Sequence, residues 1–194
     1  MNHFEPPTGG EAQDLAAVSE VLHGNTEAFR LIVDRYKEML YRLSFSFLGN
    51  REDAEECSQD ILMRAFRYLH RFSLEKRFLP WLYGIALNHI RTSYAKNQRR
   101  EARHRAWQRL AEVRHSADPQ ELLDTAQSRE EIRVAVASLP RSLREPVILH
   151  YYEELRVGTI AEILGVTEAN VKSKLLRGRR RLKKIIEQGA TPTC

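Results

Sequence analysis

Two short helices around a single glycine constrain this chain most, and they lie between Leu155 and Ile186. Gly165 breaks the first helix, and Thr167 stands where an N-cap hydroxyl would begin the second. The apolar positions of the first helix are Ile160, Ala161, Ile163 and Leu164. In the second helix, apolar positions at alternating spacings of four and three form one stripe: Val171, Leu175, Gly178, Leu182 and Ile185. This order predicts a helix-turn-helix.

The remaining surface of the second helix is strongly basic. Eight Lys or Arg residues and no acid lie between Lys172 and Lys184. The positions outside the apolar stripe that suit base edges and phosphates are Asn170, Ser173, Lys174, Arg177 and Arg181. A basic helix can also be merely a solvated face. The turn and helix that precede this one favour the DNA-reading interpretation.

Charge is unevenly distributed along the 194 residues, whose formal net charge is +5. Residues 1–23 carry four acids and no Lys or Arg, whereas residues 24–100 carry 14 basic and 9 acidic residues. Residues 131–194 repeat this surplus with 12 basic and 7 acidic residues, and the segment between them is nearly neutral. Two basic blocks on either side of a spacer indicate two surfaces that each meet a polyanion.

Other function classes find little support in the sequence. No apolar run approaches the roughly twenty residues that span a bilayer, and the acidic N-terminus does not resemble a secretory signal, so we expect a cytoplasmic protein. Cys57 and Cys194 are too few and too distant for a metal cluster, and the seven His residues are scattered. Cys57 is interpreted as a core thiol, whereas a redox role for Cys194 stays open. We expect no metal, no cofactor and no enzymatic activity.

Apolar residues recur at helical spacing through most of the chain, which predicts an all-α fold. A first helix is expected over about 27–48, with Gly49 and Asn50 closing it; its inward residues would be Phe29, Ile32, Tyr36, Leu40, Leu43 and Phe47. A second would begin near residue 51, with Ala54, Cys57, Ile61, Ala65 and Leu69 buried. A third would begin around Pro80.

The break between the two blocks is expected near Asp118 and Pro119. We therefore predict two small helical domains joined by a flexible linker. Their bounds are an acidic segment 1–23, a first domain 24–102, a linker 103–130, a second domain 131–188 and a tail 189–194. Pro140 would stop the first helix of the second domain, and Pro146 would lie in the first turn of the next helix or kink it.

Four sequence segments occur in an order that resembles one protein family. They are Asp53 to Ile61 with Arg64–Phe66, then Phe78 with Trp81–Tyr83, Ile85, Ala86 and Asn88, then Leu139–Pro140 with Arg144, and finally Val171–Leu175 with Arg177 and Arg179. The chain resembles the extracytoplasmic-function (ECF) group of sigma-70 factors over residues 28–186. The family contains the second and fourth sigma domains, which fits the two basic blocks.

The resemblance implies a factor that binds core RNA polymerase, directs it to promoters and helps to open the duplex. The polymerase-binding face, on the clamp helices of the largest subunit, would hold Asp53, Glu56, Gln59, Asp60 and Arg64. Contact with the flap region of polymerase is also expected. The minus-ten element and a flipped base would be held by Arg71, Arg77, Asn88, Arg91, Thr92 and Lys96. The minus-thirty-five element would be read by Asn170, Lys172, Ser173, Lys174, Arg177 and Arg181.

Several positions depart from the family pattern, so a promoter sequence cannot be transferred from a relative. Thr92 and Thr159 stand where the family usually has acids, and Ala169 and Asn170 stand where Gly-Thr is common. Asn170 could read adenine or simply form hydrogen bonds at the helix start. Trp81 is interpreted as core rather than as a platform for bases.

The resemblance also implies an anti-sigma partner that covers the polymerase-binding and DNA-binding faces. Such a partner could hold the protein at the membrane, whereas the active factor would be at the nucleoid. We expect a monomer, because two different promoter elements require no two-fold symmetry. The alternative is a helix-turn-helix regulator that is not a polymerase subunit. The front half of such a regulator should show a ligand pocket or an α/β receiver pattern. A nuclease is a further alternative, and it would need clustered metal ligands.

Overall fold

The computed structural model describes residues 10–111 and 124–188, with side chains described for 10–99 and 131–188. The described residues form helices and no strand, which confirms the all-α prediction. The helices are α1 (Glu11–Leu22), η1 (Thr26–Ala28), α2 (Phe29–Leu48), α3 (Arg51–Tyr68), η2 (Leu69–Arg71), α4 (Phe78–Ala111), α5 (Asp124–Ala137), α6 (Arg141–Tyr151), α7 (Val157–Leu164) and α8 (Glu168–Glu187).

Helices α2 and α3 bury the stripes that their periodicity predicts. All the residues expected to point inward from these helices are buried. Gly49 ends α2 with a left-handed φ of 71°, a conformation that costs glycine little. Asn50 then caps α3, because its side-chain oxygen accepts a hydrogen bond from the Asp53 amide at 3.2 Å. This corner turns α3 back along α2.

Helix α1 was not predicted, because residues 11–22 were assigned to the acidic segment outside the first domain. It packs against α2, where the Asp14 carboxylate is buried and bonded to Tyr36 and Arg35. Burial raises the pKa of Asp14, although both partners oppose that shift. The Glu11 carboxylate also accepts a hydrogen bond from the Phe78 amide at the start of α4. The N-terminal acids therefore anchor α1 to the helices behind it.

Helix α4 extends past the predicted end of the first domain. Pro80 lies in its first turn as expected, and the helix then continues to Ala111, nine residues past the predicted boundary at 102. Helix α5 begins at Asp124, so the backbone is helical at both ends of the predicted linker 103–130. The remaining part of the predicted linker, residues 112–123, lies outside the described residues, so its flexibility stays a prediction.

Helices α5 to α8 form the second helical unit, which ends in the helix-turn-helix. Pro140 caps α6, and Pro146 lies inside α6 at its sixth residue, past the first turn. Val171, Leu175 and Gly178 on α8 are buried, whereas Leu182 and Ile185 are half-buried near the end of the stripe. The buried stripe of α8 faces α6, α7 and α5.

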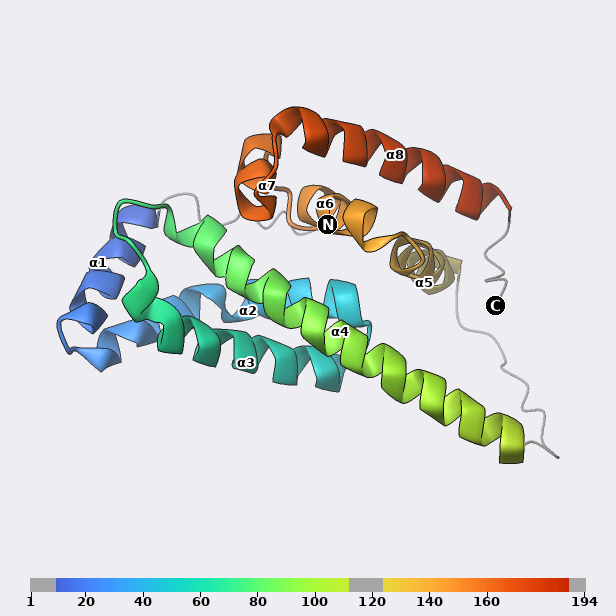
Figure 1. The fold of residues 1–194 in the computed structure, drawn as a ribbon, viewed down its shortest axis with the longest axis horizontal. Helices are drawn as coiled ribbons and strands as arrows, with labels where there is room; N and C mark the ends of the chain where they lie inside the picture. The colour runs from blue at the N-terminus through green and yellow to red at the C-terminus, as the bar shows by residue number, and fades with distance from the viewer. Residues whose placement is uncertain (1–9, 112–123, 189–194) are drawn as a thin grey trace.

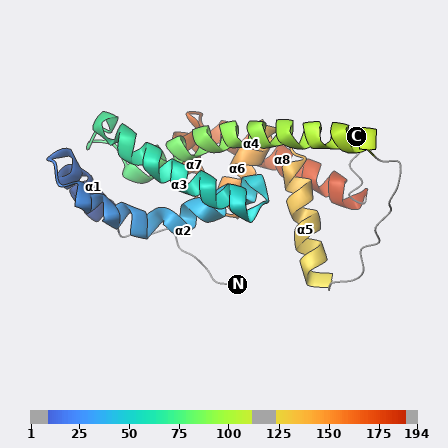
Figure 2. The same ribbon diagram turned by 90° about the horizontal axis from the view of Figure 1, so that it is seen from below.

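The long helix α4 has α3 on one side and α6, α7 and α8 on the other, while α2 crosses behind it (Figure 1). Helix α5 projects from the rest of the second unit (Figure 2). The buried side chains form one continuous cluster that runs from Ala17 in α1 to Leu175 in α8. The two predicted units are therefore in direct contact in this structure.

No helix within residues 10–111 and 124–188 is long and apolar enough to cross a membrane. The same part of the chain contains no group of three or more His, Cys, Asp or Glu side chains arranged to hold a metal ion.

Gly178 lets α8 cross α6 closely. A Cβ atom at this position would lie 2.7 Å from Cγ2 of the buried, stiff Val147 side chain. We expect Gly178→Ala to lower the free energy of unfolding by about 1–3 kcal/mol through overpacking. Urea unfolding followed by circular dichroism measures the change. The matched control is Gly84→Ala in α4, where a Cβ meets nothing within 4 Å and should stabilise the helix by about 0.5–1 kcal/mol. Equal effects of the two substitutions would contradict the packing argument.

Candidate nucleic-acid and polymerase interfaces

The turn between α7 and α8 has the geometry that the sequence predicts. Gly165 ends α7 with a left-handed φ of 64°, and the Val166 amide bonds back to the Ala161 carbonyl at 3.0 Å. Thr167 caps α8, because its hydroxyl oxygen accepts a hydrogen bond from the Asn170 amide at 3.3 Å. The leading end of α8 is therefore held in a defined direction and is exposed to solvent.

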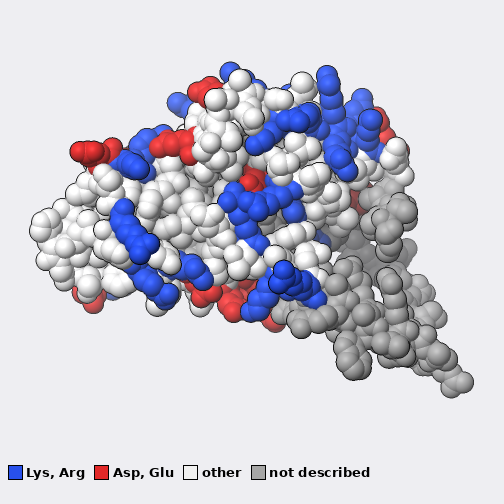
Figure 3. Space-filling model, in the orientation of Figure 1, with Lys and Arg blue, Asp and Glu red and all other residues white. Residues whose placement is uncertain are grey.

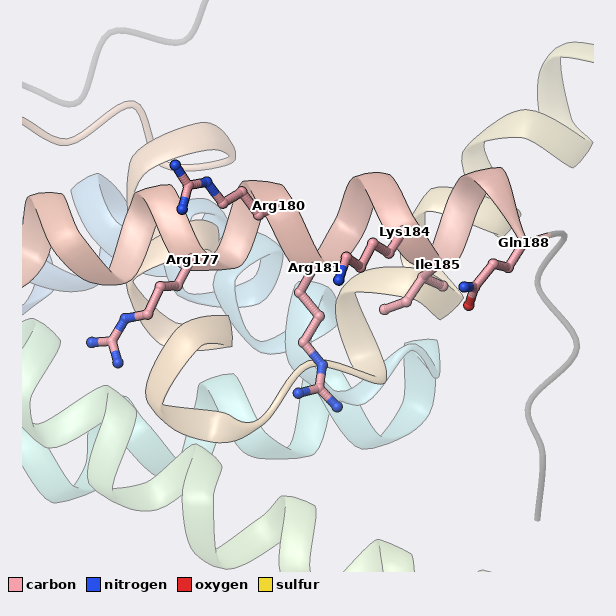
Figure 4. A pocket seen from close by; sticks show the side chains of 6 residues that line it. All are labelled: Arg177, Arg180, Arg181, Lys184, Ile185 and Gln188. Carbon is pink, nitrogen blue, oxygen red and sulfur yellow. The ribbon is translucent and has the colours of Figure 1, made fainter.

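The predicted minus-thirty-five residues fall on two parts of α8. Asn170, Lys172 and Ser173 are exposed on its leading turns. Arg177 and Arg181 instead line a groove of about 470 Å³ along the later turns, and they point away from α8 toward the helices beneath it (Figure 4). The other residues that line this groove are Arg180, Lys184, Ile185 and Gln188. The leading turns suit base reading, and the basic groove suits a phosphate backbone.

The predicted polymerase-binding face lies on α3, and part of it forms one wall of a recess against α4. Asp53, Glu56 and Asp60 line this recess of about 200 Å³. From α4 it is lined by His89, Thr92, Ser93, Lys96 and Asn97. The structure therefore brings two predicted minus-ten residues, Thr92 and Lys96, beside the predicted polymerase-binding acids.

Two contacts tie these acids to α4. The Asn97 amide donates a hydrogen bond to Asp53 at 2.8 Å. An Asp60 carboxylate oxygen lies 3.2 Å from Nε2 of the buried His89, but not in hydrogen-bonding geometry, so this contact is electrostatic. Burial lowers the pKa of His89, and Arg64 adds to the effect, while Asp60 opposes it. His89 is consequently biased toward its neutral form.

The predicted minus-ten residues on α4 are linked to one another. Arg91 donates a hydrogen bond to the side-chain oxygen of Asn88 at 2.8 Å. The Thr92 hydroxyl donates to the Asn88 backbone carbonyl at 3.2 Å. Asn88 and Lys96 are exposed, and Arg71 on η2 lies 5.4 Å from the centre of the Tyr68 ring. The loop between η2 and α4 carries the exposed Arg77.

Two of these basic residues contact the second helical unit. Arg91 pairs with Glu145 of α6 at 2.8 and 2.9 Å, and Arg77 lies 3.4 Å from Glu162 of α7. Basic and acidic side chains lie side by side on the surface between α4 and the second unit (Figure 3). Sequence reasoning did not foresee these pairs, because no local pattern shows which distant helix will face α4.

A buried polar contact that was not predicted joins the same two units. The Tyr83 hydroxyl of α4 donates a hydrogen bond to the Glu153 carboxylate at 3.1 Å, and both side chains are buried. Burial raises the pKa of Glu153 to about 7, although Tyr83 and the nearby Arg42 oppose the shift. Burial also raises the pKa of Tyr83. Glu153 lies between Tyr152 and a second acid, Glu154, so its sequence neighbours gave no signal that it would be buried.

Two interpretations of single residues are confirmed. Trp81 is half-buried and packs against Phe72 and Phe78, with ring centres 5.1 and 5.5 Å apart, as a core residue does. Cys57 is one of the buried residues of α3, and burial raises the pKa of its thiol, so the thiolate is disfavoured. Cys194 lies outside the described residues.

The two helical units match two models of one family. The model described as Sigma-70 region 2 matches residues 32–100, and the model described as Sigma-70, region 4 matches residues 129–182. Together they account for more than half of the chain, in the same order along the sequence as the two basic blocks. The chain belongs to the sigma-70 family, in its ECF group.

Two curated relatives of this sigma factor align over nearly their whole length. The ECF RNA polymerase sigma factor SigW of Bacillus subtilis is 29% identical over 174 residues, which is 86% of this chain and 93% of that protein. The RNA polymerase sigma-H factor of Pseudomonas aeruginosa is 27% identical over 184 residues, or 91% of this chain and 95% of that protein.

Two solved structures share the fold of this sigma factor. CnrH in complex with the cytosolic domain of CnrY has a TM-score of 0.68 at 21% identity, covering 91% of this chain and 99% of that chain. The sigma factor RpoE in complex with the anti-sigma factor NepR from Bartonella quintana has a TM-score of 0.56 at 21% identity, covering 82% and 96%.

The cap that the Thr167 hydroxyl forms at the start of α8 should make a measurable contribution to the free energy of unfolding. We expect Thr167→Ala to lower the free energy of unfolding by about 1 kcal/mol, since the Asn170 amide loses its acceptor. Thr167→Ser retains the hydroxyl and should stay close to wild type. Urea unfolding followed by circular dichroism compares the two variants. A serine variant as unstable as the alanine variant would show that the threonine methyl, not the cap, stabilises the turn.

Proposed function

We propose that this sigma factor binds core RNA polymerase through the exposed face of α3 and reads promoters with α4 and α8. The observation that carries the proposal is the presence of a capped helix-turn-helix and a separate acidic helix face within one sigma-70 chain. Carboxylates on α3 suit the basic side chains of a partner protein. Asn, Ser and Lys on the leading turns of α8 suit base edges in a major groove.

The residue roles within this proposal follow the predicted sets. Asp53, Glu56, Gln59, Asp60 and Arg64 would contact the clamp helices of the largest polymerase subunit, and the second unit would contact the flap region. Asn88, Arg91, Thr92 and Lys96, with Arg71 and Arg77 before them, would hold the minus-ten strand. The minus-thirty-five set would divide into base-reading residues on the leading turns and phosphate-binding Arg177 and Arg181.

Regulation by an anti-sigma factor belongs to the same proposal. The RpoE neighbour was solved with the anti-sigma factor NepR, and CnrH with the cytosolic domain of CnrY. An inhibitor of this kind would cover the polymerase-binding and DNA-binding faces. We further propose that the protein acts as a monomer in the cytoplasm, at the nucleoid when active, and at the membrane when its inhibitor is anchored there. It would have no catalytic chemistry of its own.

Transcription by purified core polymerase tests the proposal directly. We expect that adding this protein to core polymerase on fragmented DNA of the source organism creates new transcript starts. These starts should share two spaced upstream elements, which sequencing of the transcripts identifies. If folded, inhibitor-free protein neither binds polymerase nor creates starts, the protein is a helix-turn-helix regulator and not a polymerase subunit.

Variants can separate the two proposed faces. Glu56→Lys reverses an exposed charge on α3, and we expect it to weaken polymerase binding at least about tenfold, because like charges across an interface repel. Its control is Glu55→Lys, a change at an exposed residue outside the predicted face.

Asn170→Ala should leave polymerase binding unchanged and reduce discrimination between minus-thirty-five duplexes by roughly 1–3 kcal/mol if Asn170 reads a base. Fluorescence anisotropy measures both affinities. Unchanged discrimination would assign Asn170 to the helix start alone.

A further inference from the structure

A cavity of about 210 Å³ lies where α4 and the end of α2 meet α6. Side chains of both helical units line it, and ligand sites in proteins occur preferentially at such junctions. The lining divides into an apolar wall from α2 and α4 and a charged wall that comes mostly from α6. We propose that this cavity binds a small organic anion with a carboxylate group and an apolar body. The site goes beyond the proposed function, which requires no ligand of this kind.

The apolar wall comes from the first helical unit. Its residues are Phe47 of α2 and Leu87, Ile90, Tyr94 and Ala95 of α4. The first three of these are buried, and Ala95 is exposed. An apolar cavity of about 150 Å³ can hold benzene, so a cavity of about 210 Å³ has room for a benzene-sized body and one carboxylate. The volume therefore fits a ligand of roughly ten non-hydrogen atoms.

The charged wall carries an excess of positive charge. Three arginines and one acid are among the residues that line the cavity, and they are Arg91, Arg141, Arg144 and Glu145. Glu145 accepts hydrogen bonds from Arg91 at 2.8 and 2.9 Å and from Arg141 at 2.9 Å. Lys and Arg side chains gather around acidic ones over this junction of α4 and the second unit (Figure 3). Since one carboxylate cannot neutralise three guanidinium groups, the charges of the cavity complement an anion.

Arg144 is the residue whose surroundings point to a ligand. It is only 7% exposed, and its Nε atom is buried without a hydrogen-bond partner among the described residues. Nη1 donates to the Ala137 carbonyl at 3.3 Å, and the guanidinium lies 4.2 Å from the centre of the Tyr94 ring. A buried N–H group without an acceptor is unfavourable. A carboxylate oxygen in the cavity would supply the missing acceptor.

A carboxylate with an apolar body suits this cavity better than an inorganic anion or a nucleic-acid strand does. An inorganic anion would leave the apolar wall in contact with water, so it would lose the gain from covering that wall. A phosphate of DNA is attached to a sugar and to its neighbours along the strand, which a cavity of about 210 Å³ does not admit. The two walls therefore favour a ligand that combines a charge with an apolar group.

A ligand bound here would contact both helical units at once. Its carboxylate would meet α6, and its apolar body would meet α2 and α4. Binding to the folded chain and not to the unfolded one stabilises the folded state as the ligand concentration rises. We therefore expect the unfolding temperature of the full chain to rise with the concentration of the ligand.

Phenylacetate is the probe, because it joins a benzene ring to a carboxylate. A titration of the isotope-labelled full chain, followed by the chemical shifts of its backbone amides, measures both the affinity and the place of binding. We expect a dissociation constant of about 1 mM or lower, with the shifts concentrated in residues 87–95 and 141–145. Acetate supplies the charge without the body, and phenylacetamide supplies the body without the charge. Each should bind at least about tenfold more weakly than phenylacetate.

Two variants test the two walls separately. Ala95→Leu fills the cavity from an exposed position of α4, and we expect it to weaken phenylacetate binding at least about tenfold. Its matched control is Ala16→Leu, the same change at an exposed position of α1 away from the cavity, which should leave the affinity unchanged (Figure 1). Arg144→Lys keeps the charge and removes the Nε donor, so it should weaken binding about fivefold or more. Circular dichroism verifies that each variant is folded.

Three outcomes would overturn the inference. If phenylacetate binds no better than phenylacetamide, the cavity recognises no anion and its polar groups are satisfied by water. If acetate or inorganic phosphate binds as tightly as phenylacetate, the apolar wall has no part in recognition. If Ala95→Leu binds phenylacetate like wild type, the ligand lies elsewhere on the chain. None of these measurements uses polymerase or DNA, so a failure here leaves the proposed function intact.

Discussion

Burial of α4 on two sides is the constraint on which this arrangement depends. Phe78, Leu82, Tyr83, Ala86 and Leu87 are all at most 1% exposed, so the first half of the helix cannot be solvated on either of the faces that they occupy. Helices α2 and α3 cover one side, and α7 and α6 cover much of the rest. The proposed minus-ten residues of α4, which are Asn88, Arg91, Thr92 and Lys96, follow directly after this buried stretch.

Local periodicity predicted the buried stripes of α2, α3 and α8, because each follows the 3.6-residue repeat closely. It also predicted the turn at Gly165 and the cap at Thr167, which depend on single residue types. Helix α1 was missed because its anchor is a buried acid, Asp14, whose partners lie on α2 and give no local signal. No clear end for α4 could be read from the sequence, because its later turns have a strongly basic sequence that was interpreted as part of a linker.

The proposed sites were predicted less completely than the helices that carry them. The sequence could not show that Thr92 and Lys96 would border the same recess as Asp53. Nor could it show that Arg91 would meet Glu145, which lies 54 positions later in the chain. Contacts between residues so far apart in the sequence depend on how whole helices pack. Thr92 bonds to the Asn88 backbone, so this departure from the family pattern leaves an uncharged side chain on the surface proposed to meet DNA.

The recess between α3 and α4 gives the sigma factor a property that neither helix has alone. Asp53 is bonded to Asn97, and Asp60 lies against His89, so a protein that captures either carboxylate also removes a contact from α4. In the proposed complex, thermodynamic linkage would work in both directions: the factor by which polymerase changes the affinity of α4 for DNA equals the factor by which DNA changes the affinity of α3 for polymerase. The contacts that join Asp53 and Asp60 to α4 would then connect the two proposed binding surfaces.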